Sequence, residues 1–244
     1  MKVETQTDVV SEEKIQLPFK AIIFDMDGTL LESTEADYKA WERVFNDFNK
    51  RLTFEDYQPL LGIRSADVIK NQLGITEQDE VKRILKVKFD YFIEYVNENP
   101  VIPVDGAGTF LKALAQYNLK IGLATSSRKE KMRLLLEQLD FVQYFDTLVT
   151  GEEVENSKPA PDIFLMAAQR LGISPEECVV FEDGPIGVAA AKAAGMKCIA
   201  ITATHPADKL GNADLIIDRY DRSNVADLLK QLVEGKEMFD HIDS

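Results

Sequence analysis

The sequence predicts an α/β protein with a doubly wound, Rossmann-like parallel sheet and one inserted all-helical domain. From residue 104 onward, short apolar runs alternate with amphipathic helical stretches, which is typical of parallel strands joined by crossover helices. The first apolar run, 21–24, is separated from the others by residues 34–99, which show helical periodicity and no strand pattern. Acidic and hydroxyl side chains follow several apolar runs, and ligands of such sheets bind at the carboxyl ends of strands.

The length of 244 residues suits one sizeable domain with an insertion. We expect the sheet domain at residues 20–33 and 100–234, because the strand and helix patterns alternate there. Residues 34–99 are too long for a loop and too helical for the sheet, so they form the inserted domain. An N-terminal extension (1–19) and a C-terminal tail (235–244) complete this division.

The first apolar run reads as a strand buried on both faces. In the inserted block, the apolar residues from 36 to 48 fall on one helical face, a short apolar pattern covers 53–61, and helical spacing resumes at 66–73. Thr76 and Asp79 resemble a capping box that opens a long amphipathic helix, which ends at 97–100.

The second part of the chain alternates regularly. Its predicted helices are 108–117, 129–139, 161–171 and 186–194, and its predicted strands are 120–124, 147–149, 178–181, 197–201 and 214–217.

The formal net charge of −14 argues against general binding to nucleic acids or anionic membranes. No apolar window is long enough to span a bilayer, and residues 1–19 are too polar and acidic for a signal or transit peptide. We therefore expect a cytoplasmic protein, as a monomer or weak dimer. Cys178 and Cys198 fall in apolar runs and are expected to be buried and reduced.

The commonest hydrolase and nucleotide-binding signatures are missing from the sequence. His205 and His241 are the only histidines, which leaves little for a Ser-His-Asp triad or a histidine-rich metal site. Neither a G-x-S-x-G elbow nor a Walker A loop is present.

Two carboxylates, Asp25 and Asp27, stand directly after the first buried strand. Burying such charges requires a compensating cation or a shared proton, although an ordinary acidic turn would look the same locally. Thr125 and Ser126 follow another predicted strand, Glu182 and Asp183 follow a third, and Lys158 lies in a turn beside prolines. Such a set of acids, hydroxyls and one lysine fits phosphoryl transfer better than carbonyl chemistry.

The segment Asp25-x-Asp27-Gly28-Thr29 resembles the first motif of the haloacid dehalogenase superfamily of phosphotransferases. Thr125-Ser126, the Lys-Pro-x-Pro-Asp run at 158–162 and Glu182-Asp183 are similar to the later motifs of that family in order and spacing, and the resemblance covers residues 20–218. The inserted helices resemble a C1 cap of the subgroup that contains β-phosphoglucomutase and small sugar phosphatases.

The resemblance implies a role for each motif residue. Asp25 would be the nucleophile that forms an acyl phosphate, and Asp27 the general acid and base. Lys158 would steady the nucleophile and the phosphate, which Thr125 and Ser126 also bind, although N-capping alone would explain those two residues.

The same resemblance implies a magnesium site. Asp25, Glu182, Asp183 and the main-chain carbonyl of Asp27 would hold Mg²⁺, which prefers oxygen ligands. An acidic helix N-terminus is the alternative explanation for Glu182 and Asp183.

In the inserted domain, the loop 62–65 resembles the specificity loop of the subgroup, and Arg64 and Ser65 are its candidate substrate contacts. Lys88 and Trp41 match a lysine and a tryptophan of the cap, and Ser127 and Arg128 match polar positions of a second phosphate site. A solvated Arg64 and a Trp41 that only fills the core remain open.

The departures from the mutase pattern favour hydrolysis. Asp37 stands where the mutase has a histidine, and Ser65 where it has an arginine. We therefore expect a Mg²⁺-dependent phosphatase of a small phosphorylated metabolite, with a sugar phosphate as the favoured substrate. A β-phosphoglucomutase-like isomerase and a non-catalytic binding module of the same fold are the alternatives.

Overall fold

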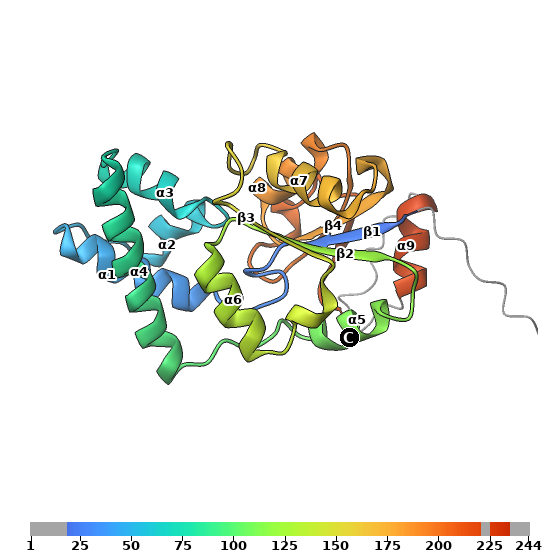
Figure 1. The fold of residues 1–244 in the computed structure, drawn as a ribbon, viewed down its shortest axis with the longest axis horizontal. Coiled ribbons are helices and arrows are strands. Elements are labelled where there is room, and N and C mark those ends of the chain that lie inside the picture. Colours follow the sequence, from blue (N-terminus) through green and yellow to red (C-terminus); the bar gives the residue numbers. More distant parts are fainter. Residues whose placement is uncertain (1–18, 221–224, 235–244) are drawn as a thin grey trace, which may run out of the picture.

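The computed structural model describes residues 19–220 and 225–234. Its centre is one parallel sheet with the strand order β3-β2-β1-β4-β5-β6, and this confirms the predicted doubly wound fold (Figure 1). The strands are β1 (Ala21–Phe24), β2 (Lys120–Thr125), β3 (Thr147–Thr150), β4 (Cys178–Glu182), β5 (Lys197–Ile201) and β6 (Leu215–Ile217). The strand order reverses between β1 and β4, and ligands bind at such a switch point.

Helices cover both faces of the sheet (Figure 1). One face carries α7 (Asp162–Leu171) and α8 (Pro185–Ala193), and the other carries α5 (Ala107–Leu114), α6 (Lys129–Gln138) and α9 (Val225–Glu234). Alternate strand residues point to opposite faces, so that Ile22 and Phe24 pack with α5, α6 and α9 while Ala21 and Ile23 pack with α7 and α8. Both sides of the strands are therefore buried, as their apolar runs predicted.

The α9 helix was not among the predicted elements. Its buried residues Val225, Leu228, Leu229 and Leu232 recur at helical spacing and belong to the same core as α5. The pattern needed to predict this helix was therefore present in the sequence.

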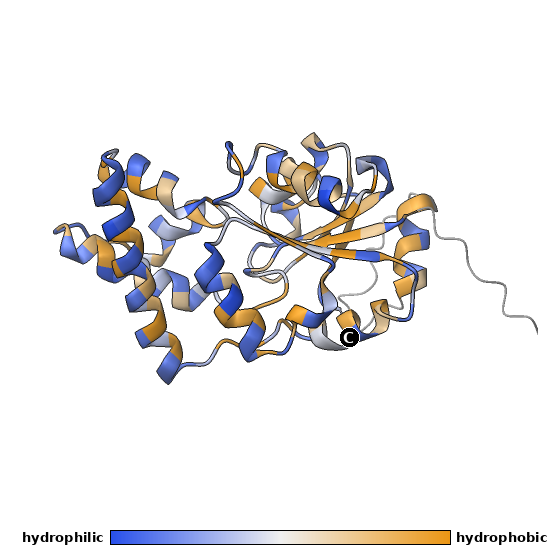
Figure 2. Cartoon of the chain, viewed as in Figure 1, coloured by the Kyte–Doolittle hydropathy of each residue, from blue (hydrophilic) through white to orange (hydrophobic). Residues whose placement is uncertain are grey.

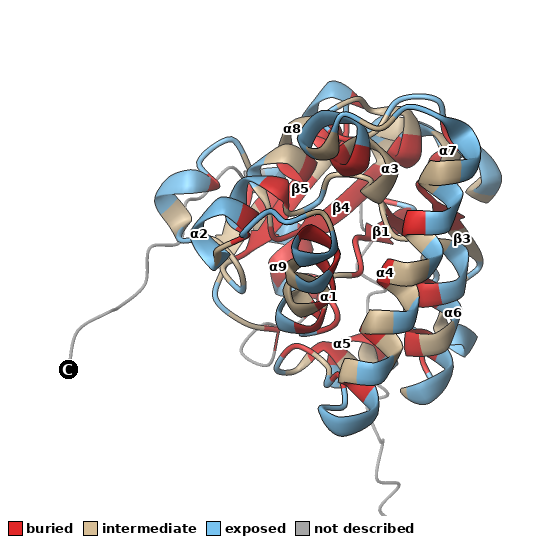
Figure 3. Cartoon of the chain, turned by 90° about the vertical axis from the view of Figure 1, so that its left-hand side faces the viewer, coloured by how far each residue is buried: buried red, intermediate tan, exposed pale blue. Residues whose placement is uncertain are grey.

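The predicted helical insertion lies between β1 and β2 and is hereafter called the cap. It contains α1 (Thr34–Asp47), α2 (Phe54–Tyr57), α3 (Ser65–Val68) and α4 (Gln78–Glu98), with a 3₁₀ turn at Gln58–Leu60 and a π turn at Ile69–Leu73. It occupies one end of the molecule, over the carboxyl ends of the strands (Figures 1 and 3). The cap has its own hydrophobic core, made of Trp41, Val44, Phe45, Leu52, Tyr57, Leu60, Val68, Ile69 and Ile84.

The predicted capping box at Thr76 and Asp79 is wrong in detail. Glu77 has an extended backbone and is itself the N-cap of α4, and its carboxylate accepts hydrogen bonds from the main-chain N–H groups of Asp79 and Glu80. An extended Glu77 cannot be the first helical residue, so Thr76 lies too early to cap the helix. A reciprocal capping box is found instead at Thr53 and Asp56, before α2.

Hydrophilic residues lie mainly on the helices and loops, while the strands are mainly apolar (Figure 2). Within the described residues, every helix falls short of the length or apolar character needed to span a bilayer. Cys178 and Cys198 are buried and free, as predicted. Residues 1–18 and the predicted tail 235–244 lie outside the described part of the chain.

Candidate active site

The strand ends bring the predicted motif residues together beneath the cap. Asp25 directly follows β1, Thr125 ends β2 and Glu182 ends β4, and these strands are neighbours in the sheet. Phe24 of β1 pairs with Leu123 of β2 on one side and with Phe181 of β4 on the other, so these three strands end at about the same level. A pocket between core and cap is lined by Asp25, Asp27, Thr125, Ser126, Glu182, Asp183 and His205 from the core, and by Asp37, Trp41, Tyr57, Ser65 and Lys88 from the cap.

Asp25, Glu182 and Asp183 form a buried acidic cluster in which one carboxylate oxygen of each lies within 4.8 Å of the others. Burial raises the pKa of Asp25 well above its usual value, against the opposing charge of Lys158. Burial, with the neighbouring Glu182, raises the pKa of Asp183 to about 7. The three negative charges would therefore repel one another unless a cation binds between them.

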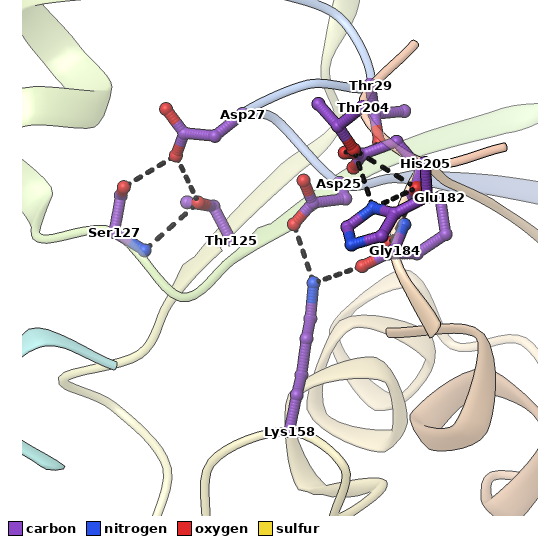
Figure 4. Close-up of polar contacts among 11 residues, drawn as sticks. Asp25, Asp27, Thr29, Thr125, Ser127, Lys158, Glu182, Gly184, Thr204 and His205 are labelled. Carbon is purple, nitrogen blue, oxygen red and sulfur yellow. Dashed lines mark hydrogen bonds and ion pairs between the residues drawn. The ribbon is translucent and has the colours of Figure 1, made fainter. Parts of the chain in front are cut away.

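Lys158 partly neutralises the acidic cluster. Its Nζ lies 2.6 Å from Oδ1 of Asp25 and 2.7 Å from Oε1 of Glu182. Burial disfavours the charged amine, but the two carboxylates outweigh it and raise the pKa of Lys158 above its usual value. Oδ2 of Asp25 accepts no hydrogen bond from the described residues, and Figure 4 shows it directed away from Lys158.

Two glycines make room for the acids. A Cβ at Gly187, in α8, would lie 1.7 Å from Oε1 of Glu182. Gly28 has a φ of +83°, and a Cβ there would lie 2.2 Å from Oδ2 of Asp183. The close approach of the backbone at both positions therefore requires glycine.

The carboxylates of the cluster are held by short local bonds. The main-chain N–H groups of Asp183 and Gly184 donate to Oε2 of Glu182 at 2.8 and 2.9 Å. Thr29 donates to Oδ1 of Asp183 at 2.9 Å, and the hydroxyl of Thr204 donates to Oδ2 (Figure 4). These contacts orient the acids before any ligand binds.

Asp27 turns away from the acidic cluster. The hydroxyls of Ser33 and Ser127 donate to its two oxygens, the second at 2.6 Å, and Nζ of Lys131 lies 2.7 Å from Oδ1 (Figure 4 shows the Ser127 contact). Burial opposes ionisation, but Lys131 outweighs it and lowers the pKa of Asp27 below its usual value. The two motif aspartates thus have opposite electrostatic surroundings.

The donor set of the acidic cluster fits a hard divalent cation. Three buried carboxylates supply oxygen ligands only, and their mutual repulsion would be relieved by a bound cation. The side chain of Asp27 lies with Ser127 and Lys131 instead, so only its main-chain carbonyl could join the three acids.

The predicted cap contacts divide into two groups. Lys88, Trp41 and Ser65 line the pocket, as does Ser127 from the core. The guanidinium group of Arg64 instead donates to three main-chain carbonyls of the core loop 151–155, at 3.0 to 3.3 Å.

Arg128 lines a second hollow that shares Asp37, Ser65 and Lys88 with this pocket, but its ion pairs are with glutamates outside both. Its side chain pairs with Glu152 at 3.0 Å and with Glu130 at 3.3 Å.

Two charged residues of the pocket were not among the predicted site residues. Lys131 contacts both Asp27 and Asp37, and the sequence marks Asp37 only as a departure from the mutase pattern. The basic stretch 128–131 contains three cations, and its sequence alone does not indicate which of them turns inward.

A Rossmann-like core that gathers two acids, a lysine and a further acidic pair beneath a helical cap defines a class of capped α/β hydrolases. Residues 22–201 match the haloacid dehalogenase-like hydrolase family. The chain belongs to this family, and its cap resembles those of the β-phosphoglucomutase and sugar-phosphate phosphatase relatives.

Individual relatives support this placement. A phosphorylated carbohydrates phosphatase of Thermotoga maritima is 35% identical over 185 residues, which cover 74% of this chain and 83% of the relative. β-Phosphoglucomutase of Bacillus subtilis is 30% identical over 205 residues, 81% of this chain and 88% of the relative. The structure of CbbY from Rhodobacter sphaeroides in complex with xylulose-(1,5)bisphosphate has a TM-score of 0.75, with 24% identity over 84% of this chain and 96% of CbbY, and shows the shared fold.

Proposed function

We propose that this chain is a Mg²⁺-dependent phosphatase that hydrolyses a small phosphorylated metabolite, with a sugar phosphate as the favoured class. The observation that carries the proposal is the contrast between the two aspartates. Asp25 presents an unpaired oxygen beside Lys158 and the acidic cluster, while Asp27 lies two residues away in a cationic setting. The name of the Thermotoga relative supports the carbohydrate class.

In the first half of the reaction, Oδ2 of Asp25 attacks phosphorus and the bond to the sugar oxygen breaks. Lys158 fixes the other oxygen of Asp25, which keeps the attacking oxygen in place. Thr125, with a buried hydroxyl at the end of β2, and the main chain after it are positioned to bind phosphate oxygens. A bound Mg²⁺ would be held by Asp25, Glu182 and Asp183 and would supply positive charge for the phosphoryl oxygens.

Asp27 moves the protons in this proposal. Lys131 keeps its carboxylate ionised before substrate binds, so the proton for the leaving oxygen arrives with a phosphate monoester monoanion. Asp27 passes that proton to the sugar oxygen and later takes one from the water that attacks phosphorus. The bond between Asp25 and phosphorus then breaks, which regenerates the free carboxylate, and Asp27 returns its proton to the departing phosphate, so that both aspartates are ionised again.

The test is phosphate release from an aryl phosphate and from a panel of sugar phosphates, with and without Mg²⁺. Asp25→Asn should abolish turnover, by at least about a thousandfold, with an unchanged circular dichroism spectrum. Asp90→Asn, on the exposed side of α4, is the matched control and should retain activity. Activity that persists in Asp25→Asn would refute the nucleophile assignment, and a folded wild type without any turnover would favour a binding module.

A mutase is the second candidate, because the Bacillus relative carries that activity in its name. Incubation with β-glucose 1-phosphate separates the two. Free phosphate that accumulates faster than glucose 6-phosphate supports hydrolysis, and the reverse supports the mutase.

A further inference from the structure

Two buried lysines from opposite sides of the pocket meet at one carboxylate. Lys88 comes from α4 of the cap and Lys131 from α6 of the core, and both are less than a tenth exposed. Their Nζ atoms lie 2.7 and 3.1 Å from the same Oδ1 of Asp37. The hydroxyl of Tyr57 donates to Oδ2 of Asp37 at 3.0 Å. Asp37 thus accepts from three donors, and its carboxylate can accept a further hydrogen bond.

Each lysine also has further partners. Lys131 pairs with Asp27 and lies 4.9 Å from the ring centroid of Phe92, while Lys88 lies 4.7 Å from that of Trp41. Because both lysines outweigh the effect of burial, the pKa of Asp37 lies below its usual value, so the carboxylate is ionised at neutral pH. The two lysines therefore carry charge that the chain itself has already neutralised.

The charges around the whole pocket can be counted in the same way. Among the described residues around it, three lysines face five carboxylates, namely Asp25, Asp27, Asp37, Glu182 and Asp183. Fully ionised, these groups carry a formal charge of −2, which one divalent cation would cancel. The nearby Arg64 and Arg128 are held by core carbonyls and by glutamates. Each of these described cations already has an anionic or carbonyl partner, so a second phosphate group would have to displace one of those partners.

We propose that Asp37 is a specificity-determining residue that restricts the substrate to monophosphates whose remaining part is an uncharged polyol. The inference rests on the proposed phosphatase function and deepens it. Asp37, Ser65 and Lys88 can exchange hydrogen bonds with substrate hydroxyls, whereas a second phosphate would meet two aspartates without a free counter-charge. Trp41, Tyr57 and Ile186 supply apolar walls against which the faces of a polyol can pack.

The fold itself does not impose this restriction. The CbbY structure with the same fold holds a bisphosphate. Exclusion of a second phosphate must therefore come from residues of this chain, and Asp37 is the acid that both lysines share.

The experiment compares fructose 1-phosphate with fructose 1,6-bisphosphate. Wild type with Mg²⁺ should show a kcat/KM ratio of at least about tenfold in favour of the monophosphate, which corresponds to about 1.4 kcal/mol. Asp37→Asn frees one lysine charge and should lower the ratio by about tenfold, mainly through a smaller KM for the bisphosphate. Asp90→Asn, on the exposed side of α4, is the matched control and should leave the ratio unchanged.

A binding measurement keeps the inference separate from turnover. In the Asp25→Asn background, calorimetry with each fructose phosphate should give the same preference and the same gain on Asp37→Asn. The double variant Asp37→Asn with Lys88→Met removes one charge of each sign and should again reject the bisphosphate. If Asp37→Asn alone does not fold, the wild-type ratio and the double variant decide.

The inference is overturned if wild type accepts both ligands within about threefold of each other, or if folded Asp37→Asn shows no gain. Absence of turnover on every monophosphate, including an aryl phosphate, would refute the proposed phosphatase, while the binding ratio would still test Asp37. Normal turnover with equal use of both fructose phosphates would refute only the role of Asp37.

Discussion

Replacing Asp183 with asparagine should stabilise the cation-free fold and abolish cation binding at the same time. In the wild type, Asp183 is buried beside Glu182 and Asp25, and Lys158 is the cation that pairs with this cluster among the described residues. Asparagine keeps the shape and removes the charge. The same substitution therefore acts in opposite directions on stability and on ligand affinity.

The expected change in the free energy of unfolding follows from the pKa of Asp183, which rises from 3.8 to about 7. At about 1.4 kcal/mol per pH unit, ionising this group in the fold costs about 4 kcal/mol above pH 7. Asparagine has one acceptor oxygen where the carboxylate accepts from Thr29 and Thr204, and rearranging that contact costs about 1–2 kcal/mol. A net gain of about 2 kcal/mol remains at pH 8.

The sign of the pH dependence is also defined. Because the pKa of Asp183 is raised in the fold, its favourable contribution is present below about pH 4 and is lost as the pH rises through about 7. The advantage of the variant should therefore shrink toward pH 4. Urea unfolding followed by circular dichroism, in chelator, measures the free energy of unfolding at both pH values.

Asp214→Asn is the matched control with the opposite expectation. Burial opposes ionisation of Asp214, but hydrogen bonds from Lys192 and Lys197 outweigh it and lower its pKa. This variant should lose about 1–2 kcal/mol at pH 8, and the loss should fade as the pH drops below about 4, through the lowered pKa.

Adding Mg²⁺ should then stabilise wild type and Asp214→Asn but not Asp183→Asn. A destabilised Asp183→Asn at pH 8 in chelator, or one that Mg²⁺ stabilises as much as wild type, would refute the reasoning.

Gly187→Ala should displace Glu182 and lower turnover at least about tenfold, at a stability cost of about 1–3 kcal/mol, while Gly211→Ala, with open space around it, should change neither quantity. Arg64→Met removes the hydrogen bonds that Arg64 makes between cap and core. A loss of about 1 kcal/mol in the docking of the cap should raise KM about fivefold, and an unchanged KM would show that these hydrogen bonds are dispensable. Trp41 is the only tryptophan and lines the pocket, so a sugar phosphate should change its fluorescence saturably and the unphosphorylated sugar should not. Equal responses to both would show that the phosphate group does not contribute to binding in this pocket.

Much of the architecture was readable from periodicity, because burial on one face or on two leaves a regular pattern along a chain. The apolar runs gave the strands, and the helical block at 34–99 separated the insertion from the sheet. The missed α9 helix carried the same signal in Val225 and Leu229. The predicted N-cap residue of α4 is wrong by one position, because Thr76 and Glu77 can both act as N-caps. Only the backbone angles select between them.

Part of the candidate active site was also predictable from the sequence. Parallel strands end at a common edge, so Asp25, Thr125 and Glu182 had to converge once their strands were neighbours. The chemistry-bearing residue types were therefore visible in the chain itself. The assigned roles of the motif residues stay predictions for the experiments above, and the domain boundaries also stay predictions.

Other features depended on how packed elements turn toward one another. The rotation of α6 against the sheet directs Lys131 inward while Arg128 pairs with surface glutamates, although both lie in one basic stretch. The placement of the cap brings Asp37 and Lys88 to Lys131, across more than forty residues of chain in each case. Periodicity describes one element at a time, whereas a shared counter-charge arises only when separate elements meet, and only the tertiary structure could reveal it.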